Sequence, residues 1–139
     1  MNWFKRLFGI QREGVTYKYD KIIDGEVNKH PVCIVTFKNS GGNVDLKMLV
    51  DSGADITLLP KWAGEMLNLK RTDLKYIGGI AGRIGYYINY TNAVVAGETL
   101  TIPVAWATQD TVPLLLGRQG VFDKFVITFD EKKGEISFR

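Results

Sequence analysis

The tripeptide Asp51-Ser52-Gly53 is the part of the sequence best suited to chemistry. It directly follows an apolar run that ends with Leu49 and Val50. A carboxylate, a hydroxyl and a glycine at that point predict a tight turn that holds a carboxyl group at the end of a buried strand. The same tripeptide also suits any turn that ends a strand, so its surroundings must decide between a catalytic and a structural role.

Two carboxyl groups that face each other in a water-poor site share one proton, because two like charges about 3 Å apart cannot both ionise. The ionised group can then act as a general base on a water molecule, while the protonated group acts as a general acid. The Asp-Ser-Gly turn occurs once in the chain. The second carboxyl group would therefore have to come from Asp51 of a second copy.

Two further motifs follow the turn along the chain. Residues 76–82 read Tyr-Ile-Gly-Gly-Ile-Ala-Gly and predict a hairpin whose tip is almost all glycine. Such a tip can lay its backbone N–H and C=O groups against an extended ligand. Residues 112–118 read Val-Pro-Leu-Leu-Leu-Gly-Arg and predict a buried strand that ends in Gly117-Arg118.

These three motifs, in this order and spacing, resemble the retropepsins, the single-domain aspartic proteases of the retroviral type. The resemblance covers about residues 30 to 139. Ser52 stands where threonine is usual in the family and retains the hydroxyl group. The chain also runs past the point where the retroviral enzymes end, so we expect a different dimer interface here.

The resemblance implies an all-β, closed β-barrel-like acid-protease fold with one or two short helices, active as a homodimer. It implies an aspartic endopeptidase that cleaves extended polypeptide segments. Asp51 of each subunit would activate the hydrolytic water, Ser52 would tie the two turns together, and Gly53 would bring its backbone close to the substrate. Asp55 would anchor the substrate main chain and form a structural ion pair with Arg118.

The remaining residues expected to contact substrate are apolar or glycine. Gly78 and Ile80 would lie over the bound peptide, with Ile80 at the tip of the hairpin. The full set of expected substrate-binding residues is Asp55, Ile56, Ile77, Gly78, Gly79, Ile80, Pro113 and Leu115. Because an extended peptide inserts alternate side chains into pockets, these apolar residues favour hydrophobic side chains at the cleaved bond.

Two alternatives belong to other functional classes. One is a non-catalytic retropepsin-like module that binds peptides or mediates dimerisation, which would not need an intact Asp51 turn. The other is a plain β-barrel in which the three motifs coincide by chance.

Composition sets the remaining limits. At 139 residues with 45% hydrophobic and 24% charged residues, the chain predicts one soluble globular domain. The net charge of +3 is mild and the Lys and Arg residues are scattered, so nothing indicates nucleic-acid binding. The one cysteine, Cys33, lies in an apolar run and is interpreted as a core residue. With one histidine, His30, placed in a loop before Pro31, we expect no metal site and no cofactor.

The N-terminal residues 1–14 form a short basic segment that we separate from the protease domain, residues 15–139. Trp3, Phe4, Leu7 and Phe8 fall at helical spacing, which predicts a short amphipathic helix. The segment is too short for a signal peptide or a membrane span, so we expect a cytoplasmic protein. We favour a segment that packs on its own domain or frays over weak membrane-surface contact through residues 1–10.

Most of the remaining chain alternates in the manner of β-strands. The expected strands are residues 15–22, 31–37, 44–50, 86–95, 100–107, 125–130 and 135–138, and the expected short helices are residues 60–68 and 119–124. The last two strands form a hairpin with an unpaired apolar edge, which we expect to pair with its twin in the dimer. Deletion of residues 135–139 would then yield an inactive monomer.

Overall fold

The computed structural model describes residues 13–23, 27–79 and 82–139. The expectation of an amphipathic helix near the N-terminus lies outside these residues, as does the expected position of Ile80. Within the described chain, no helix is long and apolar enough to cross a membrane.

Among the residues that the structure describes, strands dominate, together with one short α-helix and one short 3-10 helix. The elements are β1 (Val15–Lys18), β2 (Asp20–Ile23), β3 (Val27–His30), β4 (Val32–Phe37), β5 (Val44–Val50), β6 (Thr57–Leu59), α2 (Lys61–Met66), β7 (Lys75–Gly79), β8 (Gly82–Val95), β9 (Glu98–Ala107), β10 (Leu115–Leu116), η1 (Phe122–Lys124), β11 (Ile127–Asp130) and β12 (Glu135–Phe138).

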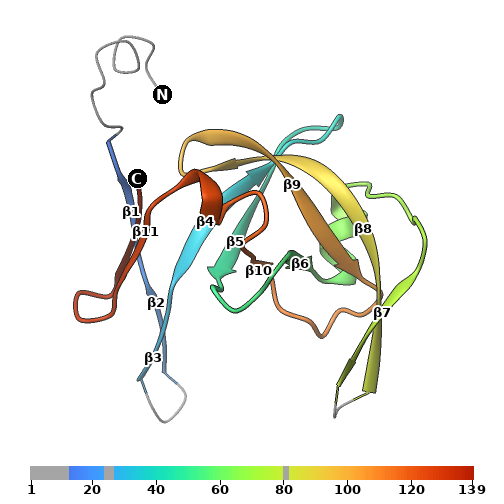
Figure 1. Cartoon of the computed structure of the whole chain (residues 1–139), viewed down its shortest axis with the longest axis horizontal. Coiled ribbons are helices and arrows are strands. Elements are labelled where there is room, and N and C mark those ends of the chain that lie inside the picture. Colours follow the sequence, from blue (N-terminus) through green and yellow to red (C-terminus); the bar gives the residue numbers. More distant parts are fainter. Residues whose placement is uncertain (1–12, 24–26, 80–81) are drawn as a thin grey trace.

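The main sheet closes on itself, as the sequence predicted (Figure 1). Its seven strands follow the order β4-β5-β10-β6-β9-β8-β7, and β4 also pairs with β8. The closing pairs are Thr36 with Val94 and Phe37 with Ala93. The short strand β10 lies between β5, to which it is parallel, and β6, to which it is antiparallel. Residues that follow β5 and residues that follow β10 therefore meet at one end of the barrel.

The barrel interior is built by alternation along β4 and β5. Alternate side chains of each strand are buried: Cys33, Val35, Phe37, Leu46, Met48 and Val50. This confirms the prediction that Cys33 is a core residue. Burial raises the pKa of the Cys33 thiol to about 12, so the thiol stays protonated and unreactive at neutral pH.

A second sheet joins the two ends of the described chain. Its order is β1-β12-β11, and β12 pairs on one side with β1 and on the other with β11. The expected hairpin of residues 125–130 and 135–138 is therefore present, but β12 is enclosed on both sides and only β11 of the hairpin is an edge strand. Ile136 and Phe138 are fully buried in the core, so deletion of β12 would damage the fold rather than yield a folded monomer.

A two-stranded hairpin, β2–β3, projects from the barrel at the same end as β7 (Figure 1). The sequence predicted one strand over residues 15–22 and a loop at His30, and both predictions were wrong. The strand breaks at Tyr19, and His30 pairs with Asp20 as the last residue of β3. The dipeptide Asp24-Gly25, which is typical of hairpin turns, was the signal that could have indicated this hairpin.

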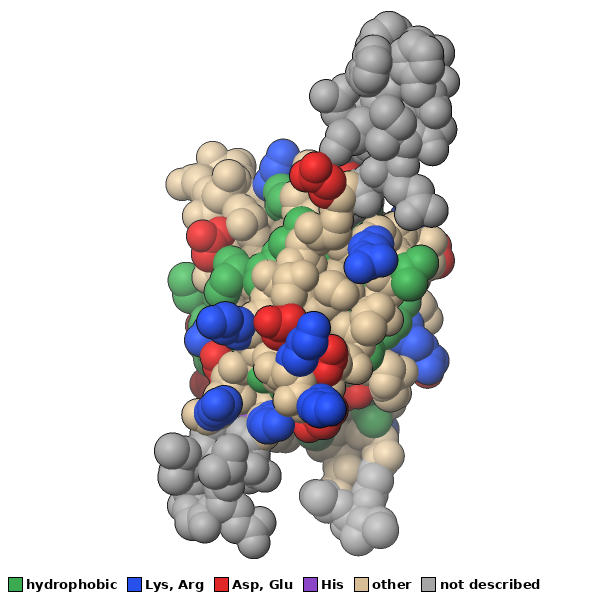
Figure 2. Space-filling model, turned by 90° about the vertical axis from the view of Figure 1, so that its left-hand side faces the viewer, with side chains coloured by type: hydrophobic (Ala, Val, Ile, Leu, Met, Phe, Trp, Pro, Cys, Tyr) green, Lys and Arg blue, Asp and Glu red, His purple; other side chains and the backbone are tan. Residues whose placement is uncertain are grey.

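Charges of both signs mix on the face formed by these N- and C-terminal strands (Figure 2). Lys47 Nζ lies 3.1 Å from Asp20 Oδ2. Lys29 Nζ donates to the Glu131 carbonyl oxygen at 3.0 Å and so ties β3 to the turn between β11 and β12. Such exposed contacts contribute little stability individually, so the hairpin depends mainly on its own backbone pairing.

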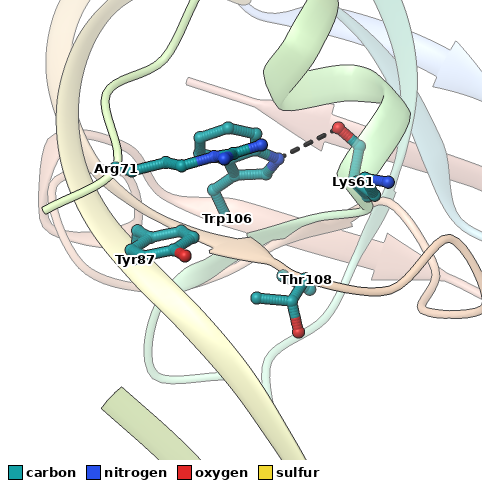
Figure 3. Close-up of a pocket in the computed structure, with 6 residues that line it drawn as sticks. Lys61, Arg71, Tyr87, Trp106 and Thr108 are labelled. Atoms are coloured by element: carbon teal, nitrogen blue, oxygen red, sulfur yellow. Dashed lines mark hydrogen bonds between the residues drawn. The ribbon is translucent and has the colours of Figure 1, made fainter. Parts of the chain in front are cut away.

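The helix α2 packs against the end of β9 through Trp106. The Trp106 Nε1–H donates to the Lys61 carbonyl oxygen at 3.0 Å, and Figure 3 shows Arg71 extending toward the indole beside Tyr87. The Tyr87 and Trp106 rings have centroids 5.5 Å apart. Gly64 allows this close contact, because a Cβ added there would lie 2.1 Å from Trp106 Nε1.

Gly64→Ala should lower the free energy of unfolding by about 1–3 kcal/mol, because the added methyl group overpacks the contact with the indole. Gly41→Ala is the matched control, since a Cβ there meets nothing within 4 Å. Urea denaturation followed by tryptophan fluorescence measures both variants. Equal stability of the two variants would contradict the packing role of Gly64.

Candidate functional site

The turn that begins at Asp51 is held by hydrogen bonds to its own residues and to β10. The Asp51 N–H donates to the Leu116 carbonyl oxygen at 3.0 Å. Asp51 Oδ1 accepts a hydrogen bond from the Gly53 N–H at 2.8 Å. The Ala54 N–H donates to the Asp51 carbonyl oxygen at 3.2 Å. One carboxylate oxygen is thus fixed by the turn, and the side chain remains only partly buried.

Gly117 brings two backbone segments together directly beside this turn. Its N–H donates to Thr57 Oγ1 at 3.1 Å, and Thr57 is fully buried. A Cβ at Gly117 would lie 2.3 Å from the Ile56 carbonyl carbon, so only glycine fits. Thr57 was not among the residues predicted from the sequence to belong to the site. Its signal was a single hydroxyl residue in the apolar run from Ile56 to Leu59.

Arg118 links the two segments through its backbone and its guanidinium. Its N–H donates to the Ala54 carbonyl oxygen at 2.9 Å, and Nη1 donates to the Ser52 carbonyl oxygen at 3.1 Å. Nη2 forms an ion pair with Asp55 Oδ1. The two side chains of the pair are 49% and 74% exposed. The pair therefore lies at the surface of this subunit, and its expected effect on stability is that of a surface pair.

An apolar row crosses the outer face of the barrel next to Asp51. Leu115 pairs with Leu49 on one side and with Leu58 on the other. All three are partly exposed, whereas their neighbours Val50 and Leu116 are buried, because successive strand residues point to opposite faces. The sequence predicted Leu115 as a substrate contact but missed Leu49 and Leu58. Only the strand register shows that Leu49 and Leu58 lie beside Leu115.

The glycine-rich motif forms the hairpin of β7 and β8, which we term the flap. Ile77 pairs with Ile84, and Gly78 pairs with Arg83. Ile77 is 51% exposed, so it is free to contact a ligand. Gly78 and Gly79 lie on the same strand, near the outer end of the hairpin.

The structure therefore groups the expected site residues into two regions. Asp51, Ser52, Gly53, Asp55 and Arg118 lie together at the turn, with Ile56 next to Gly117. Pro113 is exposed just before β10, and Leu115 belongs to the apolar row. The flap carries the glycine residues on a separate hairpin, joined to the barrel through β8. Among the described residues, no cluster of His, Cys, Asp or Glu could hold a metal ion.

Comparison with known proteins agrees with this geometry. Residues 34–119 match the family model described as aspartyl protease. The fold is similar to that of a retropepsin-like aspartic protease from Rickettsia conorii, with 19% identity, a TM-score of 0.65, and coverage of 91% of this chain and 99% of that one. It is also similar to the EIAV protease in complex with the inhibitor HBY-793, with 25% identity, a TM-score of 0.50, and coverage of 65% and 83%. A search of curated proteins found no match.

The family match includes the Asp51 turn, the flap and Arg118, and it ends before η1. The structural match to the rickettsial protein shows that the fold as a whole is retropepsin-like. The predicted all-β, closed retropepsin-like fold of the single subunit is thus confirmed.

Arg118→Ala should lower the free energy of unfolding by about 1 kcal/mol more than Lys47→Ala does. Both variants remove one surface ion pair, but Arg118→Ala also removes the hydrogen bond to the Ser52 carbonyl oxygen. Urea denaturation of both variants provides the measurement. If the two losses are equal, the guanidinium does not stabilise the turn.

Proposed function

Because the chain belongs to the aspartyl protease family, we propose that it is an aspartic endopeptidase that hydrolyses peptide bonds in extended polypeptide segments. Its active site would be shared between two subunits, with one Asp51 from each. The observation that carries this proposal is the Asp51 turn itself, in which one carboxylate oxygen accepts the Gly53 N–H while the side chain stays partly exposed. The described chain contains one such turn, so two copies are needed for a pair of carboxyl groups.

The two Asp51 carboxyl groups would share one proton and hold a water molecule between them. The ionised group takes a proton from the water as its oxygen bonds to the carbonyl carbon of the substrate, while the protonated group donates its proton to the carbonyl oxygen. When the tetrahedral intermediate collapses, the carboxyl group that took the proton from the water gives it to the nitrogen, and the C–N bond breaks. The other carboxylate takes a proton from one hydroxyl group of the intermediate, so that a carbonyl group forms again and the pair of carboxyl groups again shares one proton. Acid–base catalysis of this kind contributes about 10²–10⁴-fold to the rate.

Ser52 and Gly53 would complete the shared site. Both are exposed in the single subunit, which leaves the Ser52 hydroxyl available to the turn of a second copy. The Ser52 carbonyl is held in place by Arg118. The lack of a side chain at Gly53 lets a substrate backbone approach the carboxylates closely.

The substrate would bind as an added strand, held by main-chain hydrogen bonds to Asp55 on the turn and to Gly78 and Gly79 on the flap. Its alternate side chains would meet apolar walls from both regions. One wall consists of Ile56, Pro113 and the row of Leu49, Leu58 and Leu115, and the other consists of Ile77 and Ile84 on the flap. We therefore propose that the cleaved bond is flanked by hydrophobic residues.

Asp51→Asn should lower the rate of peptide cleavage at least about a hundredfold, because an amide cannot act as the base. Folding should be nearly unchanged, since the amide oxygen can still accept the Gly53 N–H. Incubation with a mixed peptide library from acidic to neutral pH, followed by mass spectrometry of new termini, measures the loss.

Asp45→Asn is the control, because Asp45 lies on β5, the strand that leads into the Asp51 turn. Its carboxylate accepts a hydrogen bond from Thr36 rather than from the turn. A residual rate above about a hundredth of the parent rate would contradict the role of Asp51. A parent protein that folds and dimerises but cleaves no peptide would favour the non-catalytic module.

The free edge of β11 is the part of the C-terminal sheet best suited to pair with a second copy. Val126 and Arg139 exchange two backbone hydrogen bonds, of 2.9 and 3.0 Å. Since such pairs alternate along an antiparallel ladder, the N–H groups of Ile127 and Phe129 point to the free edge. Val126 is 69% exposed and Phe129 39% exposed, so this edge is apolar and unprotected.

The opposite edge of the same sheet, β1, is polar. Thr16 and Lys18 of this strand are exposed, and a lysine on an edge strand discourages pairing. The chain also runs directly from Arg118 through η1 into β11, which connects this edge to the Asp51 turn. We therefore place the two-fold axis of the dimer next to β11.

Phe129→Pro should convert the dimer to a monomer and abolish cleavage, because proline removes an outward N–H group and leaves the bonds to β12 intact. Thr16→Pro is the control on the β1 edge and should leave an active dimer. Analytical ultracentrifugation and the cleavage assay at several protein concentrations measure both properties. An active dimer of the Phe129→Pro variant would exclude the β11 edge.

A further inference from the structure

The flap has unusually few side chains on one of its two faces. Directly opposed residues of a hairpin share a face. Tyr76 is opposed by Gly85, and Arg83 is opposed by Gly78. Two of these four positions therefore have no side chain. The other face carries the direct pair of Ile77 and Ile84.

Across these two glycines, Arg83 and Tyr76 contact each other diagonally. The Arg83 Cζ lies 4.2 Å from the centroid of the Tyr76 ring, within the range of a cation–π contact. No described carboxylate lies within ion-pair distance of Arg83, so the ring is the guanidinium's partner in the described chain. A planar guanidinium stacks on an aromatic face better than an ammonium does.

The base of the flap, around Gly85, is held by contacts that do not involve Arg83 or Tyr76. The Thr108 N–H donates to the Gly85 carbonyl oxygen at 2.9 Å. Leu74 and Thr108 side chains lie close to Gly85. Tyr87 packs on Trp106, as seen in Figure 3. Beyond Gly85 the outer part of the hairpin is held by its backbone ladder, the isoleucine pair and the contact of Arg83 with Tyr76.

We propose that Arg83 is a positioning residue for substrate binding, which acts by stacking on Tyr76 and holding the outer part of the flap as an ordered hairpin. This inference rests on the proposed protease function. A flap held in this way presents Ile77, Ile84 and the backbone of Gly78 to an extended peptide. Because the hairpin is already ordered, it loses less conformational entropy when the peptide binds. Arg83 itself lies on the face that carries no isoleucine, and it touches neither substrate nor the reacting atoms.

The proposal predicts a specific kinetic pattern. A flap that has lost this contact must be ordered both in the substrate complex and in the transition state. The free-energy cost of ordering it therefore weakens the binding of both states equally. Arg83→Ala should raise KM by about 2–5-fold, the range of an exposed cation–π contact, and leave kcat nearly unchanged. Tyr76→Leu should have the same effect. The double variant should be no worse than either single variant.

The experiment has two arms, one of which does not depend on cleavage. Hydrogen–deuterium exchange of the parent, Arg83→Ala and Arg83→Lys measures protection of residues 74–86 in the full-length protein. Exchange should accelerate by about 2–5-fold in Arg83→Ala, and Arg83→Lys should recover part of the protection. Lys75→Ala, which removes a cation from the other face of the same hairpin, should exchange like the parent.

Each outcome decides one point. Unchanged exchange in Arg83→Ala would overturn the proposed contact, and faster exchange with an unchanged KM would overturn the positioning role. A fall in kcat with KM unchanged would also overturn it. A parent protein that cleaves no peptide would contradict the proposed function and therefore the positioning role, while the exchange arm still tests the contact itself.

Discussion

The buried hydrogen bond from the Gly117 N–H to Thr57 Oγ1 is the constraint on which the rest of the site depends. It joins β10 to β6 at a point where a side chain larger than hydrogen would collide with the Ile56 backbone. The preceding residue, Leu116, accepts the Asp51 N–H, and the following residue, Arg118, reaches the Ser52 carbonyl oxygen. One close approach of two backbones thus places the carboxylate, its turn and the guanidinium together.

The single subunit exposes polar, apolar and strand-edge surfaces around the Asp51 turn. Ser52 and Asp55 are exposed, and the apolar row of Leu49, Leu58 and Leu115 is partly exposed. The edge strand β11 carries the exposed Phe129. Exposed apolar surface often marks a binding site, and an unpaired strand edge can pair with a strand of another chain. A second copy and an extended peptide would cover them, which is why the proposed dimer and the proposed substrate fit the same subunit.

Local sequence signals predicted much of the barrel. The hairpin of β4 and β5 follows from strict alternation on both sides of a glycine-containing turn. The hairpin of β8 and β9 follows from two runs rich in β-branched and aromatic residues on either side of Gly97, and Pro60 marks the start of α2. The β2–β3 hairpin was missed although its Asp-Gly dipeptide was visible. The place of β12 could not be predicted, because alternation shows which residues of a strand are buried but not which strands lie beside it.

The sequence by itself determined the family and the motifs by which it is identified, since Asp51-Ser52-Gly53, the glycine-rich flap and Gly117-Arg118 are local patterns of residues in a given order. The tertiary structure decided everything that depends on neighbours far apart in the chain. It showed that the Arg118–Asp55 pair is exposed, that Leu49 and Leu58 flank Leu115, and that β12 is enclosed on both sides. Strand register and burial are properties of the closed sheet, and no local pattern contains them.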